Sequence, residues 1–154
     1  MPLVLGSAIL KLTGERFVAY WLFKSEPSSW SWDRQVEAGA KGTFWNGVRN
    51  HSAKLNLMAM KTGDQGFFYH SNEGKAVVGI VEVIREYYPD PTDESGKFGM
   101  VDVKALRALP RPVTLDAIKA ETRLSDMALV RQSRLSVQPV TDAEWRLVCT
   151  MGGL

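Results

Sequence analysis

The stretch QGFFYHSNEGKAVVGIVEVIREY, residues 65–87, decides the fold. Its first part, Gln65-Gly-Phe-Phe-Tyr-His-Ser71, is rich in aromatic residues and is typical of a strand, and Asn72-Glu-Gly-Lys75 indicates a hairpin turn. Residues 76–87 alternate and are apolar on both sides at their start, which predicts a strand buried on both faces. The predicted sides are Val77, Gly79, Val81 and Val83 on one, and Val78, Ile80 and Ile84 mostly on the other. We therefore expect hairpins to build the middle of the chain.

The segments before this stretch predict a buried strand and two helices. Residues 18–23, Val-Ala-Tyr-Trp-Leu-Phe, are β-branched and aromatic, and Ser25-Glu-Pro27 is expected to end the strand. Ser29 or Ser31 is expected to cap a short helix that runs through Ala38.

A short extended piece, Gly42-Thr-Phe-Trp-Asn-Gly47, then closes in an Asn-Gly turn. Residues 50–60 predict a second helix, with Asn50 as a possible N-cap residue. Leu55, Met58 and Ala59 lie on one face at helical spacing.

The segments after the stretch predict two more strands and three helices. Residues 88–96 contain two prolines and are expected to form a loop. Residues 98–109 alternate again, and Pro110-Arg-Pro112 is expected to break that strand. The remaining elements are expected at 114–121 (a helix capped by Thr114), 125–131 (a short helix), 134–139 (extended) and from the capping box Thr141-Asp-Ala-Glu144 onward (the last helix).

This order predicts an α/β protein of the α+β type. We expect a curved mixed β-sheet or small open barrel with flanking helices, because the strict strand–helix alternation of a doubly wound sheet is absent. The chain has 154 residues, which is enough for one domain with a substantial core. Residues 18–154 are expected to form that domain, and residues 1–17 an N-terminal extension.

Charge and composition limit the partners. The net charge is +2, so any contact with nucleic acid is expected to be local rather than a long electrostatic track. The single cysteine, Cys149, excludes a disulfide within the chain and fits helix packing. The apolar start lacks a basic region and is short, so we expect no signal peptide, no membrane partner and an intracellular location, cytoplasmic or, in a eukaryote, nuclear.

Aromatic and short polar residues gather in segments near the ends of strands. Flat rings, edge-reading polar groups and basic side chains are what a flipped or single-stranded base requires, although aromatic residues near strand ends more often pack in a core. Trp45, beside the Asn-Gly turn, is a plausible pocket residue, whereas Trp30 and Trp32 flank a helix start and fit hydrophobic staples. The segments are Tyr20–Pro27, Phe44–Ser52, Phe67–Ser71 and Tyr87–Pro91.

Enzyme motifs are missing from the sequence. His70-Ser71 near Asp64 suggests a hydrolytic triad, but adjacent residues on a strand point in opposite directions and there is no Gly-x-Ser-x-Gly elbow. No glycine-rich phosphate loop occurs. A hydrolase that uses His51 or His70 is therefore the less favoured interpretation.

Several motifs in fixed order resemble the EVE domain family of the PUA-like superfamily, over about residues 18–151. The matching segments are Trp21-Leu-Phe-Lys-Ser-Glu-Pro27, Trp45-Asn-Gly-Val-Arg-Asn50, Met60-Lys-Thr-Gly-Asp64, Phe67-Phe-Tyr-His-Ser71, Val78-Gly-Ile80, Tyr88-Pro-Asp-Pro-Thr92, Arg134-Leu-Ser-Val-Gln-Pro139 and Glu144-Trp145. The resemblance implies a PUA-like fold related to the YTH readers of N6-methyladenine in RNA. It also implies recognition of a modified base such as 5-methylcytosine in DNA, without catalytic activity, metal or cofactor.

The resemblance also implies a site. A base or ligand pocket is expected from Lys24, Ser25, Trp45, Asn50, Tyr69, His70 and Ser71, with Arg49 on a phosphate. By sequence alone, Asn50 is better explained as a helix cap, and Arg49 as the partner of either a phosphate or a carboxylate. His51-Ser52-Ala53 stands where the family usually has Tyr-Gln-Ala, which bears on base preference.

The expected partner is DNA or RNA with a modified base, and a monomer is the expected state of the chain. Two alternatives stay open: an RNA-binding module without modification specificity, and a scaffold that binds a small molecule.

Overall fold

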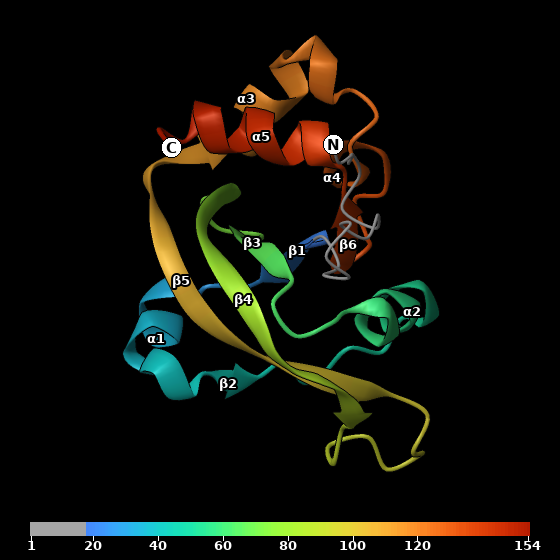
Figure 1. Ribbon diagram of the computed structural model, residues 1–154. Helices are drawn as coiled ribbons and strands as arrows, with labels where there is room; N and C mark the ends of the chain where they lie inside the picture. The colour runs from blue at the N-terminus through green and yellow to red at the C-terminus, as the bar shows by residue number, and fades with distance from the viewer. Residues whose placement is uncertain (1–17) are drawn as a thin grey trace, which may run out of the picture.

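A strongly curved, mixed six-stranded sheet organises the part of the chain that the computed structural model describes, residues 18–154 (Figure 1). The strand order is β2-β5-β4-β3-β1-β6; β1 and β3 are parallel, and the other neighbours are antiparallel. The expected extension over residues 1–17 lies outside the described residues. The strands are β1 (Tyr20–Ser25), β2 (Thr43–Phe44), β3 (Gln65–His70), β4 (Ala76–Pro89), β5 (Gly99–Thr114) and β6 (Val137–Val140).

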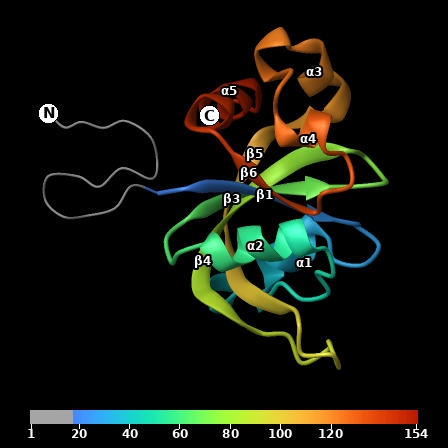
Figure 2. The same cartoon turned by 90° about the vertical axis from the view of Figure 1, so that its right-hand side faces the viewer.

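Helices cover both faces of this sheet (Figure 2). One face, which we call the near face, carries α1 (Trp32–Glu37) and α2 (His51–Ala59). The opposite face, which we call the far face, carries α3 (Leu115–Ala120), α4 (Ala128–Arg131) and α5 (Asp142–Met151). In the described residues, the 3₁₀ turn η1 (Gly39–Lys41) connects α1 to β2, and the 3₁₀ turn η2 (Thr122–Leu124) lies between α3 and α4. The predicted order of strands and helices is confirmed.

Each central strand feeds two separate cores because its side chains alternate between the faces. In β1, Trp21 and Phe23 pack in the near-face core, and Leu22 packs in the far-face core. In β3, Phe68 joins the near-face core, and Phe67 joins the far-face core. Residues 18–154 therefore form two hydrophobic layers, one on each face of the sheet.

The predicted caps are present. Ser31, Asn50 and Thr114 each accept a hydrogen bond from a first-turn backbone N–H, and Thr141 and Glu144 form the reciprocal capping box of α5. The turn at 72–75 is also confirmed, since Asn72, Gly74 and Lys75 all have positive φ between β3 and β4.

The two sides predicted for the β4 strand are wrong. Val77 and Ile80 face the far core, whereas Val78, Val81 and Val83 face the near core. Register shifts between Val77 and Gly79 and between Ile80 and Val81 break the simple period of two. Gly79 turns toward the near face, where a Cβ would lie 2.4 Å from the Trp32 ring.

The predicted end of β5 is also wrong, because the strand continues through Pro110 and Pro112 to Thr114. β2 pairs with β5 only at Asp102 and Val103, so this later part of β5 has no β2 partner and forms an edge of the sheet. A proline lacks an N–H and is tolerated on such an edge.

The apolar face predicted for α2 is not the buried one. Leu55 and Met58 are 65% and 48% exposed, and Ala53 and Leu57 enter the near-face core. Only a narrow stripe of α2 faces the sheet, so the rotation of the helix about its own axis determines which residues are buried.

Candidate functional site

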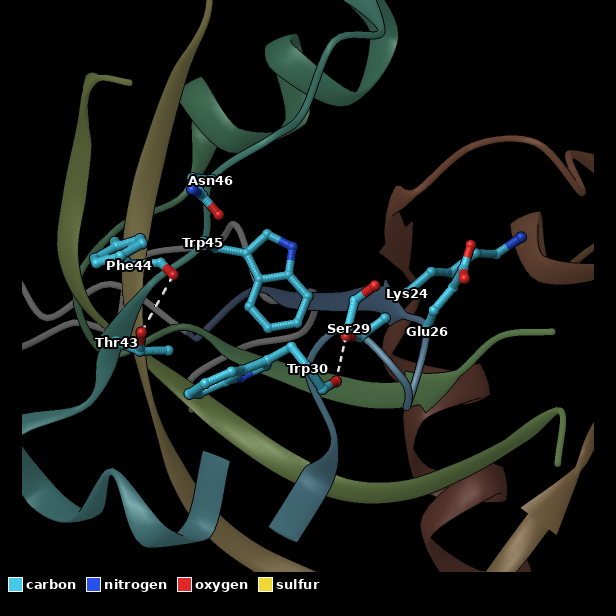
Figure 3. A pocket seen from close by; sticks show the side chains of 9 residues that line it. Lys24, Glu26, Ser29, Trp30, Thr43, Phe44, Trp45 and Asn46 are labelled. Carbon is cyan, nitrogen blue, oxygen red and sulfur yellow. Dashed lines mark hydrogen bonds between the residues drawn. The ribbon is translucent and has the colours of Figure 1, made fainter. Parts of the chain in front are cut away.

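A cavity of about 440 Å³ opens at the carboxyl end of β1, on the near face of the sheet (Figure 3). This volume is in the range of sites that hold a small organic ligand. We call it the tryptophan cavity. Its lining comes from the end of β1, the turn that follows and the segment around β2, and consists of Lys24, Ser25, Glu26, Ser29, Trp30, Thr43, Phe44, Trp45 and Asn46.

Trp45 forms one wall because β2 delivers it to the edge of the core. The backbone N–H of Trp45 donates to the Val101 carbonyl at 2.8 Å, which continues the β2–β5 pairing by one residue. The indole packs edge-on against Phe23 and Phe68, with centroids 5.2 and 5.6 Å apart. Trp45 is therefore only 8% exposed, yet it lines the cavity.

Gly42 permits the approach that places Trp45. Its φ is +71°, and a Cβ there would lie 2.4 Å from the backbone oxygen of Val103. A side chain at this position would therefore push the segment that carries Trp45 away from β5.

The indole N–H of Trp45 is an available donor. Within residues 18–154, no group accepts a hydrogen bond from Trp45 Nε1, although neighbouring indoles have acceptors. Figure 3 shows this nitrogen on the ring edge that points away from Trp30. A ligand against the ring can therefore accept a hydrogen bond from it.

Trp30 forms a second aromatic wall and is held firmly. Its Nε1 donates to Gln35 Oε1 at 2.8 Å, and Gln35 Nε2 donates to the Val103 carbonyl at 3.3 Å. The Ser25 hydroxyl donates to the Trp30 carbonyl. Because Gln35 is fully buried, the ring position is tied to the sheet itself.

Lys24 lines the cavity, and its amine is directed away from Trp45 (Figure 3). Its Nζ donates to the Ser133 carbonyl at 2.5 Å and lies 5.9 Å from the centre of the Tyr69 ring. Partial burial lowers the pKa of Lys24 below the ordinary lysine value.

The loop between Trp45 and α2 is anchored by Asp90. This buried carboxylate accepts the Gly47 N–H at 2.8 Å and Arg49 Nη1 at 3.1 Å, while Thr92 donates to its other oxygen. Burial alone would raise the pKa of Asp90, but these hydrogen bonds together lower it to about 2. The loop is therefore held by an ionised carboxylate.

A sequence model of the EVE domain matches residues 19–151. The chain belongs to the EVE domain family.

Known relatives agree with this assignment. Chicken thymocyte nuclear protein 1 is 36% identical over 86% of this chain and 68% of its own length. The solution structure of Rpa0253 from Rhodopseudomonas palustris is 69% identical, with a TM-score of 0.84 over 88% of this chain and 94% of its own. Human THYN1, solved with DNA that contains 5-methylcytosine, is 31% identical, with a TM-score of 0.83 over 88% of this chain and 98% of its own.

The fold extends to a more distant group. A YTH domain of Zygosaccharomyces rouxii, solved with N6-methyladenosine RNA, is 17% identical, with a TM-score of 0.54 over 88% of this chain and 86% of its own. The predicted fold class, a PUA-like curved mixed sheet with flanking helices, is confirmed.

This EVE domain brings together three of the predicted pocket residues. Lys24, Ser25 and Trp45 line the tryptophan cavity. Asn50 does not line it; its side chain caps α2 and borders a separate hollow.

The wall expected from Tyr69, His70 and Ser71 does not border the tryptophan cavity. Tyr69 is 3% exposed and packs in the far-face core. His70 Nε2 accepts the Trp32 N–H at 3.1 Å, and burial lowers the pKa of this histidine, against a smaller opposing effect of Asp33. Ser71 donates its backbone N–H to the Ser25 carbonyl. These residues support the cavity from behind, because β3 runs beside β1.

Arg49 and His51 also have local partners. Arg49 bonds to Asp90, Thr92 and its neighbour's carbonyl, so its expected phosphate contact stays a prediction. His51 is exposed and lies 5.2 Å from Phe98, outside the tryptophan cavity. The departure from the family pattern at residue 51 is thus outside the cavity.

Sequence reasoning missed the other six lining residues, Glu26, Ser29, Trp30, Thr43, Phe44 and Asn46. Trp30 and Trp32 look alike in the sequence, but Trp32 packs in the core against Phe68 and Trp30 lines the cavity. The Pro-Ser-Ser run that follows Glu26 was the available signal, because it predicts a turn at the end of a strand and such connections often carry binding residues.

Two further properties concern the described residues. Within residues 18–154, no group of three histidine, cysteine or acidic side chains is placed to hold a metal ion. No helix in this range has the length and apolar character to cross a membrane.

Proposed function

We propose that the chain is a nucleic-acid-binding protein that takes one exposed, modified base into the tryptophan cavity. The observation that carries this proposal is the pair of indole rings, Trp30 and Trp45, that line one cavity with free polar groups beside them. Stacking of a base on an aromatic ring contributes about 1–3 kcal/mol, and a base taken out of its helix needs such contacts to offset lost stacking.

The polar lining suits the edge of a base. Trp45 Nε1 supplies a donor, and the Asn46 amide supplies both a donor and an acceptor. The Glu26 carboxylate can accept from an exocyclic amine, as carboxylates do with cytosine. This combination favours an amino-bearing base, such as 5-methylcytosine, which is contained in the DNA bound to the human relative.

We also propose that the chain binds rather than catalyses. Neither described histidine borders the tryptophan cavity, and His70 already accepts a hydrogen bond from the Trp32 backbone. The intracellular location and the monomeric state remain predictions.

Titration of the full chain with short DNA and RNA oligonucleotides tests this function. Each oligonucleotide carries a single cytosine or 5-methylcytosine, or a single adenine or N6-methyladenine, and binding is followed by fluorescence anisotropy. We expect tighter binding of a methylated member. Trp45→Ala is expected to weaken that binding by about 1–3 kcal/mol, because the stacking wall is lost.

Trp45→Phe separates the ring from its N–H, since it keeps a flat wall and removes the donor. The matched control is Trp145→Phe, which alters a tryptophan in the far-face core. Equal affinity for all oligonucleotides, with no effect of Trp45→Ala, contradicts the proposal. Methylation-independent binding to RNA alone supports the module without modification specificity, and a co-purified small molecule seen by mass spectrometry supports the scaffold.

A further inference from the structure

A second depression lies beside the tryptophan cavity. It has a volume of about 340 Å³ and is formed by Asn50 and Ser52, at the start of α2, together with residues 131–135 before β6. We call it the arginine hollow. Lys24 links the two sites, because it lines the tryptophan cavity while its Nζ bonds to the carbonyl of Ser133 in the hollow.

The lining of the hollow carries positive charge and no carboxylate. Its charged members are Arg131 and Arg134. Arg131 is occupied, since it donates to the Ser125 carbonyl and to Asp126 Oδ1. Arg134 is exposed, and no described residue bonds to its guanidinium.

The segment that presents Arg134 is held in place from beneath. The fully buried Gln138 donates from Nε2 to the Leu135 carbonyl at 2.8 Å, and the Leu135 N–H donates to the Gln132 carbonyl at 3.0 Å. Lys24 fixes Ser133 from the other side. The loop therefore offers its arginine from a defined position, which reduces the entropy lost when a ligand binds.

We propose that the arginine hollow binds a backbone phosphate next to the nucleotide whose base enters the tryptophan cavity, with Arg134 as the principal contact. The inference rests on the proposed function. Guanidinium groups match phosphate oxygens in charge and geometry, and phosphate contacts position a nucleic acid without reading its sequence. This proposal gives the Arg134-Leu-Ser-Val-Gln-Pro139 motif a function. Arg134 contacts the nucleic-acid backbone, and Gln138 stabilises the loop that carries Arg134.

Salt-dependent titrations of the full chain test this site. With a single-stranded oligonucleotide that contains one 5-methylcytosine, Arg134→Ala is expected to weaken binding about tenfold at low salt and to reduce the slope of log K against log salt by about 0.7. The same loss is expected for the unmodified oligonucleotide, so the methylation preference is unchanged. Arg107→Ala, which removes an exposed arginine of β5, is the matched control and is expected to change neither quantity.

Neutral methylphosphonate linkages, placed one at a time beside the 5-methylcytosine, locate the contact. One such linkage is expected to weaken binding of the wild type and to have little effect on Arg134→Ala. If Arg134→Ala leaves both the affinity and the salt slope unchanged, the site is overturned. It is also overturned if the effect of Arg134→Ala adds to the effect of each neutral linkage, because Arg134 then contacts none of those phosphates. If the wild type binds the methylated and unmodified oligonucleotides equally, base reading is overturned instead. This outcome is therefore distinct from failure of the phosphate site.

Discussion

At the scale of single residues, the site depends on positions where a side chain would not fit or a polar group has a fixed partner. Gly42 lets the chain pass close to β5 just before Trp45. Trp30 and Trp32 differ by two positions, but Gln35 turns one into a cavity wall while Gly79 makes room for the other in the core. The space that Gly79 leaves for Trp32 comes from a strand distant in sequence, so the local pattern does not distinguish the two tryptophans.

Gly42→Ala is expected to destabilise the protein by about 2–4 kcal/mol, because it combines a positive φ with a clash against backbone. Urea unfolding monitored by circular dichroism measures the loss. Gly39→Ala is the matched control: its φ is also positive, but nothing lies within 4 Å of its Cβ, so we expect about 1 kcal/mol. Equal losses at the two glycines would show that packing against Val103 is unimportant.

At the scale of elements, local signals located the helix starts well. Ser31, Asn50, Thr114 and Thr141 all cap the helices they were predicted to begin, because a cap depends on a few neighbouring residues. Two predictions that depended on neighbours distant in sequence were less successful. The end of β5 and the buried face of α2 were wrong, since edge pairing and helix orientation are set by the rest of the sheet.

The loop between Trp45 and α2 should respond to acid through Asp90. Its pKa is lowered to about 2 from an ordinary value of 3.8, so its ionisation stabilises the folded state above about pH 4. That contribution, about 2 kcal/mol, is lost as the pH falls from about 4 toward 2. Denaturant unfolding between about pH 4 and 2 should show this fall in unfolding free energy for the wild type. The fall should be smaller for Asp90→Asn, which has no carboxylate at this position.

Asp90→Asn should also weaken binding of the methylated oligonucleotide at neutral pH, because the loop that carries Asn46 loses its ionic anchor. Glu94→Gln, an exposed change in the same 90–98 connection, is the control and is expected to alter neither property. An Asp90→Asn protein with the wild-type acid profile would show that other carboxylates dominate.

At the scale of the whole molecule, one sheet separates a near-face core that holds the site from a far-face core that supports it. Trp145 stacks between Tyr20 and Phe67 in the far core, with centroids 4.2 and 4.0 Å away. The tryptophan cavity and the arginine hollow are lined by residues that are absent from that core.

This division predicts that far-face changes alter stability without altering recognition. Ile118→Ala, at a fully buried position in the far core, is expected to cost about 2–5 kcal/mol of unfolding free energy. At temperatures where the variant is folded, its affinity and methylation preference should equal those of the wild type. A changed preference would show that the two cores are coupled through β1 and β3.

The sequence by itself determined the order of strands and helices, the helix caps, the mixed sheet and the family, because these follow from hydrophobic period, turn chemistry and ordered motifs. Of the pocket residues expected from the family motifs, the structure places Lys24, Ser25 and Trp45 around one cavity, and their role in binding stays a prediction. Only the tertiary structure decided that Tyr69, His70 and Ser71 support that cavity from behind, and that Trp30 and Glu26 line it. The reason is geometric: alternation along a strand separates adjacent residues onto opposite faces, while pairing and loop closure bring distant residues together.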